Sequence, residues 1–166
     1  MSGKNEQHKI VQIDIVEVKK LSYYEKLLAS FDKEINLDRK KIPVDFSIKY
    51  GIDFKDNLFM LELGVDFRNN DKDKINLFGI STYHKFRISD IQLVLKKEEE
   101  NKSSINKLFL ANILGIAISS TRGMLAILNT SDDYKNILLP MINPVAIIEN
   151  AKQDFIVVQE KKPELV

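Results

Sequence analysis

Few side chains in this sequence have the type and spacing that a catalytic or metal site needs. The chain has two histidines, His8 and His84, and neither has a second histidine at the spacing of metal ligands. We expect His84 at a surface or edge position of a strand. Cysteine is absent, and no glycine-rich phosphate loop or nucleophile elbow occurs. The sequence therefore predicts a protein that is not an enzyme and that holds no metal or cofactor.

Acidic residues are the remaining candidates for proton chemistry. Asp14 and Glu17 lie in the first predicted strand, and Asp53, Glu62 and Asp66 lie at polar positions of two later ones. Acidic and basic residues that alternate in this way are typical of a solvated sheet face, where they also protect the edges. An acidic face of this kind can also dock a basic partner, with electrostatics setting its orientation.

The composition indicates one ordinary globular domain. The 166 residues include 25 Lys and Arg against 24 Asp and Glu, a net charge of +1, and 44% are hydrophobic. We expect a single domain, 1–166, with flexible tails at 1–9 and about 156–166. The near-zero charge argues against nucleic-acid binding, which needs broad phosphate neutralisation. Residues 1–9 contain no apolar run typical of a signal or transit peptide, so we expect a cytoplasmic protein.

Alternating apolar residues predict four antiparallel strands. The first, Ile10–Val18, is rich in β-branched residues and switches parity, which indicates a bulge. The other three alternate with period two between short polar turns, and they span Val44–Phe54, Phe59–Phe67 and Phe78–Ile88.

Two connecting segments have their own patterns. Leu21–Leu37 predicts a short helix or an ordered crossover, with Ser22 and Glu25 spaced as in a capping box. The charge run Lys96–Ser104 predicts a solvated loop or the first turn of a helix.

Apolar residues at spacings of three and four predict a long helix over Ser104–Leu128. They occupy nearly its whole circumference, so the helix needs cover on two sides, which one four-stranded sheet cannot supply. We therefore predict an oligomer with Leu108, Ile113 and Ile116 at the interface. The longest apolar run, Leu108–Ile118, is shorter than the roughly 20 residues of a bilayer span, so we expect no direct membrane insertion.

The chain ends with a second, shorter helix. Asn143 offers a capping side chain and Pro144 a preorganised first helical residue, for a helix that reaches about Gln153. The fold class predicted is therefore α+β, with a four-stranded antiparallel sheet followed by a long helix and a short C-terminal helix.

Two further segments are richer in apolar residues than connections usually are. They are the crossover, with Tyr23, Tyr24, Leu27, Leu28 and Phe31, and the stretch before the last helix, with Ile137, Leu138, Leu139, Met141 and Ile142. Such residues commonly pack against a sheet. They can instead line an exposed apolar groove, because Met and aromatic side chains make adaptable binding surfaces.

These features occur together in one known family. Arg122 lies late in the long helix, within Ser119–Gly123, and Leu139 and Pro140 precede Asn143 before the last helix. With four long antiparallel strands, this pattern resembles SecB, the protein-export chaperone, and its relatives over about Ile10–Ile148. Two residues separate Pro140 from Asn143, where the family usually has one.

The resemblance implies an ATP-independent chaperone, or holdase, that forms a homotetramer as a dimer of dimers. Non-native polypeptides would bind in apolar grooves between sheet, crossover and terminal helix. The residues in the matching segments are Tyr23, Phe31, Ile35, Ile42, Leu138 and Met141. The clients would be preproteins, with SecA as a further partner at Asp14 and Glu17, or an antitoxin of a toxin–antitoxin system. Export members are distinctly acidic, whereas this chain is balanced, so both roles stay open.

A second class of function fits the same elements. In a small-ligand carrier, a helix crosses a curved antiparallel sheet and encloses an apolar cavity. That function predicts a monomer whose helix keeps a polar face, and the apolar pattern of Leu108–Ile118 argues against it. A hydrolase or isomerase would need polar residues that converge in a cavity, whereas the inward strand positions are mainly Val, Ile, Leu and Phe.

Overall fold

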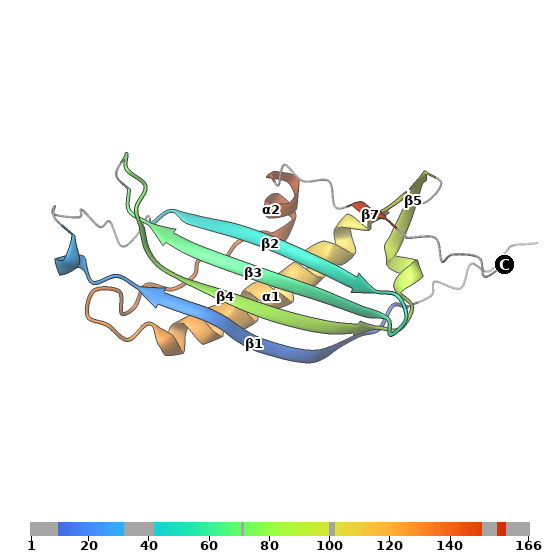
Figure 1. Ribbon diagram of the computed structural model, residues 1–166, viewed down its shortest axis with the longest axis horizontal. Coiled ribbons are helices and arrows are strands. Elements are labelled where there is room, and N and C mark those ends of the chain that lie inside the picture. Colours follow the sequence, from blue (N-terminus) through green and yellow to red (C-terminus); the bar gives the residue numbers. More distant parts are fainter. Residues whose placement is uncertain (1–9, 32–41, 71, 100–101, 151–155, 159–166) are drawn as a thin grey trace, which may run out of the picture.

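The chain folds as an α+β protein in which a four-stranded antiparallel sheet is followed by a long helix and a short one, so the predicted fold class is confirmed. The computed structural model describes residues 10–31, 42–70, 72–99, 102–150 and 156–158 (Figure 1). The sheet forms one layer and the long helix lies diagonally behind it. Ile35 and the N-terminal segment 1–9 lie outside the described residues.

The strands of the main sheet lie in the order β1-β4-β3-β2. Their bounds are β1 Ile13–Glu25, β2 Val44–Asp53, β3 Leu58–Arg68 and β4 Asn76–Ile88. Strands β2, β3 and β4 are joined by the predicted polar turns, whereas β1 pairs with β4 and not with β2. Both β1 and β2 are therefore edges of this sheet, and the crossover between them must pass from one edge to the other.

Strand β1 is longer than predicted and starts later. The bulge is confirmed, because the register with β4 shifts between Ile15 and Glu17, and it shifts again between Lys20 and Ser22. The predicted capping box at Ser22 and Glu25 is wrong, because both residues belong to β1. Pairing with β4 places these residues in extended backbone, so no helix begins there to be capped. The crossover then starts with a short 3₁₀ turn, η1, at Leu28–Ser30.

One face of the sheet carries the core. Buried residues alternate along β3 and β4, and those on β4 include Phe78, Ile80, Phe86 and Ile88. His84 has the same parity and is fully buried, so the predicted surface or edge position is wrong. The reason is that β4 is an inner strand, and every second residue of it faces the helix layer.

The long helix α1 spans Lys107–Leu128 and begins at a capped residue. The side chain of Asn106 accepts hydrogen bonds from the backbone N–H groups of Leu108 (2.9 Å) and Phe109 (3.2 Å). The buried side chains of α1 are Phe109, Leu110, Ala111, Ile113, Leu114, Ala117, Ile118, Thr121 and Leu125. Its exposed positions include Asn112, Ser119 and Gly123.

Leu110, Leu114 and Ile118 are buried within one chain, and the helix α2 and the segment that returns from α1 also contact α1. That a second copy covers the rest of α1 stays a prediction. The apolar surface of α1 that stays in water is concentrated at its ends, where Leu108 is 68% exposed and Ile127 is 77% exposed.

Helix α1 is long and apolar enough to cross a membrane by length and composition alone, because it has 22 residues. The length argument from the shorter run Leu108–Ile118 is therefore wrong. Half of the most apolar window of α1 is buried inside the fold, where its side chains pack on the sheet. The core helix of a soluble domain has this arrangement.

A second, three-stranded sheet was not predicted. After the 3₁₀ turn η2 (Ile91–Val94), β5 (Leu95–Glu99) and β6 (Lys102–Ile105) form a hairpin, so the loop predicted for Lys96–Ser104 is wrong. Its charged sequence has no apolar alternation, and backbone pairing alone defines these strands. The strand β7 (Ile156–Val158) pairs with β6, so this part of the predicted flexible tail is also a strand.

The short helix α2 spans Pro144–Asn150, and its predicted cap is confirmed. The side chain of Asn143 accepts a hydrogen bond from the backbone N–H of Val145 at 3.0 Å. The end predicted at about Gln153 lies outside the described residues.

Candidate functional site

The crossover is fastened to the loop after α1 at one end of the sheet. The hydroxyl of Tyr134 donates to the backbone carbonyl of Lys26 at 2.5 Å, and the backbone N–H of Leu28 donates to the carboxylate of Asp133 at 2.7 Å. Tyr134 is fully buried, and its ring centroid lies 4.7 Å from that of Phe78. Burial, and then the charges of Asp133 and Glu25, raise the pKa of Tyr134 to about 12. Two hydrogen bonds therefore join the loop to the first part of the crossover.

Asn129, the residue after α1, fixes the course of that loop. Its side-chain amide donates to the backbone carbonyl of Tyr134 at 2.7 Å and to that of Ile137 at 3.0 Å. Asn129 is buried, so these bonds are shielded from competing water. They place Ile137 at the start of the segment 137–143 that returns alongside α1; we call 137–143 the return segment.

Arg122 of α1 holds the return segment at its middle. Its Nε donates to the backbone carbonyl of Leu139 at 2.9 Å, and its terminal nitrogen donates to that of Pro140 at 2.7 Å. Ile137 and Leu139 are consequently buried. The side chains between and after them face water, with Leu138 58% exposed and Met141 91% exposed. A charged side chain thus fixes a segment that presents two large apolar residues to solvent.

The predicted groove residues of the crossover are only partly accessible. Tyr23, Phe31 and Ile42 are half-buried and pack against the main core. The hydroxyl of Tyr23 donates to the carboxylate of Glu25 at 2.6 Å. Burial raises the pKa of Tyr23, and this hydrogen bond raises it further. Leu27, one of the apolar crossover residues noted in the sequence, is 59% exposed beside η1.

We define the apolar surface as the exposed Leu138 and Met141 of the return segment. The residues that hold this surface in place were harder to identify from the sequence than the apolar residues of the surface. Arg122 stood out only through the resemblance to SecB, as the arginine late in the long helix. The sequence did not indicate a structural role for Tyr134 or Asp133, because the polar stretch around them predicts only a turn.

The predicted interface residues separate into two environments. Leu108 and Ile116 line an open groove of about 510 Å³ between α1 and α2, together with Asn112, Ser119 and Val145. Ile113 is fully buried against the sheet of its own chain, so its side chain does not reach this groove.

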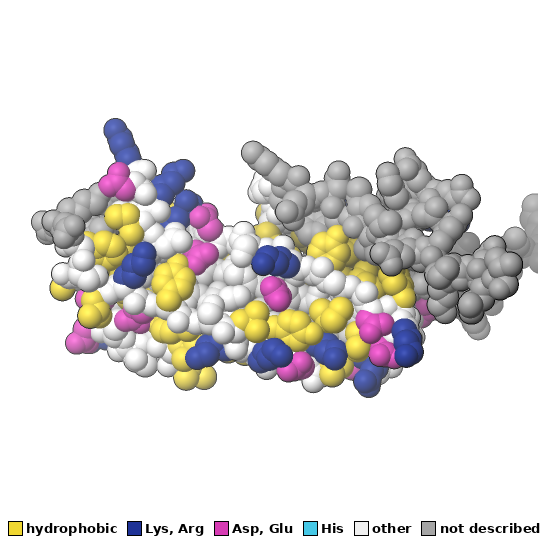
Figure 2. Space-filling view, viewed as in Figure 1, with side chains coloured by type: hydrophobic (Ala, Val, Ile, Leu, Met, Phe, Trp, Pro, Cys, Tyr) yellow, Lys and Arg dark blue, Asp and Glu magenta, His cyan; other side chains and the backbone are white. Residues whose placement is uncertain are grey.

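The predicted docking residues lie on the outer face of the main sheet, opposite basic residues. Asp14 is in register with Arg87 of β4, and Glu17 with Lys85. The ammonium of Lys19 also lies 3.2 Å from the carboxylate of Glu17. Figure 2 shows basic and acidic side chains interspersed across the sheet. Asp14 and Glu17 therefore lie on a face of mixed charge, unlike the acidic face that the resemblance implies.

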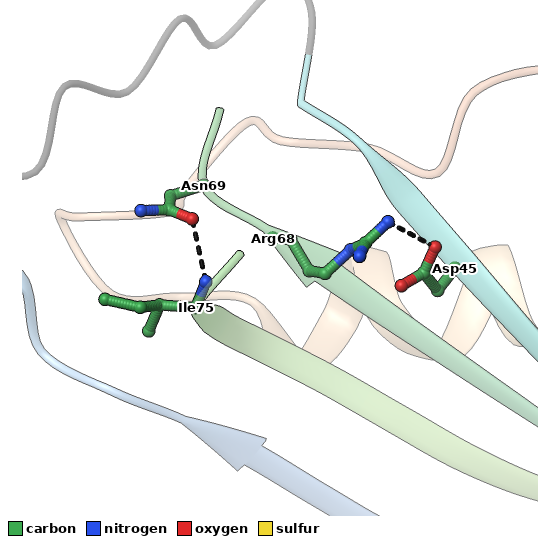
Figure 3. Close-up of polar contacts among 4 residues, drawn as sticks. All are labelled: Asp45, Arg68, Asn69 and Ile75. Carbon is green, nitrogen blue, oxygen red and sulfur yellow. Dashed lines mark hydrogen bonds and ion pairs between the residues drawn. The ribbon is translucent and has the colours of Figure 1, made fainter. Parts of the chain in front are cut away.

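The same mixing occurs where β2 and β3 meet, near the end of the crossover (Figure 3). The guanidinium of Arg68 donates to the carboxylate of Asp45 at 2.5 Å, across the two strands. Next to it, the backbone N–H of Ile75 donates to the side-chain oxygen of Asn69 at 2.8 Å and closes the turn between β3 and β4. These contacts tie β2 to β3 and close the β3–β4 turn at this corner of the sheet.

In the part of the chain that the structure describes, no group of three or more His, Cys, Asp or Glu side chains is placed to hold a metal ion. His84 is fully buried and its Nε2 lies 3.0 Å from the hydroxyl of Thr82. The site with the most distinctive geometry is therefore the apolar surface.

The chain matches no protein-family model and no curated protein.

Proposed function

We propose that this protein is an ATP-independent holdase that binds non-native polypeptides at the apolar surface, as the resemblance to SecB implies. Binding would occur by burial of client apolar side chains, without a fixed sequence code. The protein would act in the cytoplasm, with no catalytic step and no cofactor.

One observation carries this proposal. Leu138 and Met141 are held in water by a segment whose backbone is fastened to α1 through Arg122. Exposed apolar side chains that lie together can mark a binding surface. Leucine and methionine side chains also adapt to differently shaped partners, which suits a chaperone with varied clients.

The small-ligand carrier has less support. The space between the sheet and α1 is filled by fully buried side chains, among them Leu61, Leu63, Ile113, Leu114 and Ala117. An apolar ligand would have to displace these side chains, and a well-packed core resists such insertion.

Two surfaces support assembly of the proposed homotetramer. The first is the outer side of α1, where Leu108 is exposed beside the α1–α2 groove. The second is β1, an edge strand on which Ile15, Val16 and Leu21 are exposed. An unpaired edge with exposed apolar residues is a natural place for another chain to add. Two different surfaces are what a dimer of dimers requires.

The client is proposed as a preprotein or an antitoxin. SecA stays a candidate partner at Asp14 and Glu17, but the basic residues opposite them make this face a weaker match to a basic partner than an acidic face would be.

The test is suppression of aggregation of a chemically unfolded protein, in the absence of nucleotide. Leu138→Ser and Met141→Ser are each expected to weaken client binding by about tenfold, since burying one such side chain contributes roughly 1.5–3 kcal/mol. The free energy of unfolding should change little, because both side chains already face water.

Ile10→Ser is the matched control, because Ile10 is 89% exposed and precedes the far end of β1. Its holding activity should equal that of the natural chain. Holding that survives both substitutions in the return segment, or that falls equally in the control, would contradict the proposed surface.

A further inference from the structure

Three polar side chains lie together inside the otherwise apolar layer between the sheet and α1. They are Thr82 and His84 of β4 and Thr121 of α1, and all three are fully buried. The two threonine hydroxyl oxygens are 2.8 Å apart, and Nε2 of His84 is 3.0 Å from the hydroxyl of Thr82. The hydroxyl of Thr82 is also 3.3 Å from the backbone carbonyl of Leu63. This cluster joins the sheet to the helix through side-chain hydrogen bonds.

The surroundings of Nδ1 favour one tautomer of His84. With the proton on Nε2, the ring donates to the hydroxyl of Thr82, which has the carbonyl of Leu63 within reach as an acceptor for its own proton. Nδ1 is then an unprotonated nitrogen, and it is buried with no hydrogen-bond partner in the described part of the chain. The other tautomer would leave a buried N–H without an acceptor, which is the more costly arrangement.

A second proton on His84 would therefore create a buried charge with an unpaired N–H. Across the sheet, His84 is in register with Leu61 of β3 and Val18 of β1, and the ring of Phe86 stacks beside it at 6.3 Å. Thr121 faces it from α1 through Thr82. The charged residue on this side of β1 is Lys20, in register with Thr82. Burial lowers the pKa of His84 to about 4.

We propose that His84, Thr82 and Thr121 form a pH-sensitive latch, in which the neutral imidazole keeps α1 on the sheet and protonation releases it. Release of α1 would expose the apolar faces that α1 and the sheet bury between them. The proposal does not depend on the holdase function.

The sign follows from the two protonation states. The pKa of His84 is lower in the closed form than the 6.5 of a histidine in water, so the open form binds the proton more tightly. The closed form is therefore favoured above about pH 6.5 and loses its advantage as the pH falls toward 4. Between about pH 7 and pH 4.5, this linkage raises the ratio of the open form to the closed form by about 50-fold.

Amide hydrogen exchange of α1 measures this opening, with His84→Gln as the test variant. Glutamine can keep a donor toward Thr82 but cannot take up a proton in this range. In the natural chain, the protection factors of the α1 amides should fall by about 50-fold between about pH 7 and pH 4.5, beyond any fall seen in H84Q. The comparison with H84Q removes the effects of acid on every group that the two proteins share. A second control is H8A, which removes the other histidine and should behave as the natural chain does.

A second measurement does not require the variant to fold. The ring signals of His84 in the natural chain should titrate near pH 4 in nuclear magnetic resonance, together with loss of α1 protection. Titration near pH 6.5 would overturn the proposal, as would equal acid sensitivity in H84Q. Simultaneous loss of protection in every strand would also overturn it, because His84 would then affect only global stability.

Discussion

Polar side chains fix the loops that carry the apolar surface. Tyr134 joins the loop after α1 to the crossover, Asn129 sets the path of that loop, and Arg122 holds the return segment. Each side chain donates hydrogen bonds to backbone carbonyls that are not paired with a neighbouring strand. Because buried polar groups must be satisfied, each such contact strongly limits the conformations open to its loop.

Tyr134→Phe tests this at the level of one hydroxyl group. The ring and its contact with Phe78 would remain, so near pH 7 the free energy of unfolding should fall by about 1 kcal/mol, the usual net value of one hydrogen bond. The pKa of Tyr134 is raised from 10.0 to about 12, so its contribution is fully present below pH 10 and is lost as the pH rises through 12.

Denaturant unfolding of both proteins between about pH 8 and pH 12 measures this difference. The natural chain should lose stability more steeply above pH 10, so the two curves should converge. Tyr24 titrates in both proteins and cancels in the comparison, whereas the pKa of Tyr23 is raised in part by the charge of Tyr134 and loses that contribution in the variant. A gap that stays constant through this range would contradict the role assigned to the Tyr134 hydroxyl.

The secondary-structure elements were largely predictable from the sequence, whereas their pairing was not. Alternation identified β2, β3 and β4 within a few residues, and the parity switch near Val16 identified a bulge. The pairing of β1 with β4 left no trace in the sequence, because alternation defines which face is buried and not which strand lies alongside. The β5–β6 hairpin was missed for a related reason, since charged residues on short strands carry no period.

Gly79 shows how closely three strands approach on the outer face of the sheet. Tyr24 of β1 crosses Gly79 of β4, and its hydroxyl donates to the carboxylate of Asp66 of β3 at 2.6 Å. A Cβ at position 79 would lie 2.5 Å from the Asp66 carboxylate and 2.8 Å from the backbone carbonyl of Val65. Only glycine leaves room for this arrangement.

Gly79→Ala should therefore lower the free energy of unfolding by about 1–3 kcal/mol, because a backbone atom is among the clashes. Gly123→Ala is the matched control. A Cβ at position 123 meets nothing within 4 Å, and alanine in an exposed helix is favoured over glycine by about 1 kcal/mol, so this variant should gain stability. Equal effects of the two substitutions in denaturant unfolding would refute this account of the sheet.

At the scale of the whole molecule, the sequence predicted where apolar residues gather but not which of them reach water. Three of the predicted groove residues, Phe31, Ile42 and Tyr23, are partly buried against the core. Leu138 and Met141 are exposed to water. The difference arises from Arg122 and the α1 loop, whose contacts join residues far apart in the chain. A hydrophobic pattern cannot show contacts of that kind.

Assembly of the proposed tetramer is tested by two substitutions on the same helix. Leu108→Asp places a charge on the exposed end of α1, so one chain should still fold while the association between copies weakens. Ile113→Asp buries the same charge beneath the sheet, so it should prevent cooperative folding altogether. Light scattering should give four times the 19.1 kDa of one chain for the natural protein and a smaller mass for L108D, with its circular dichroism unchanged. If the natural protein is monomeric, or if L108D keeps the full mass, then α1 does not mediate assembly, and the exposed edge of β1 becomes the surface to change next.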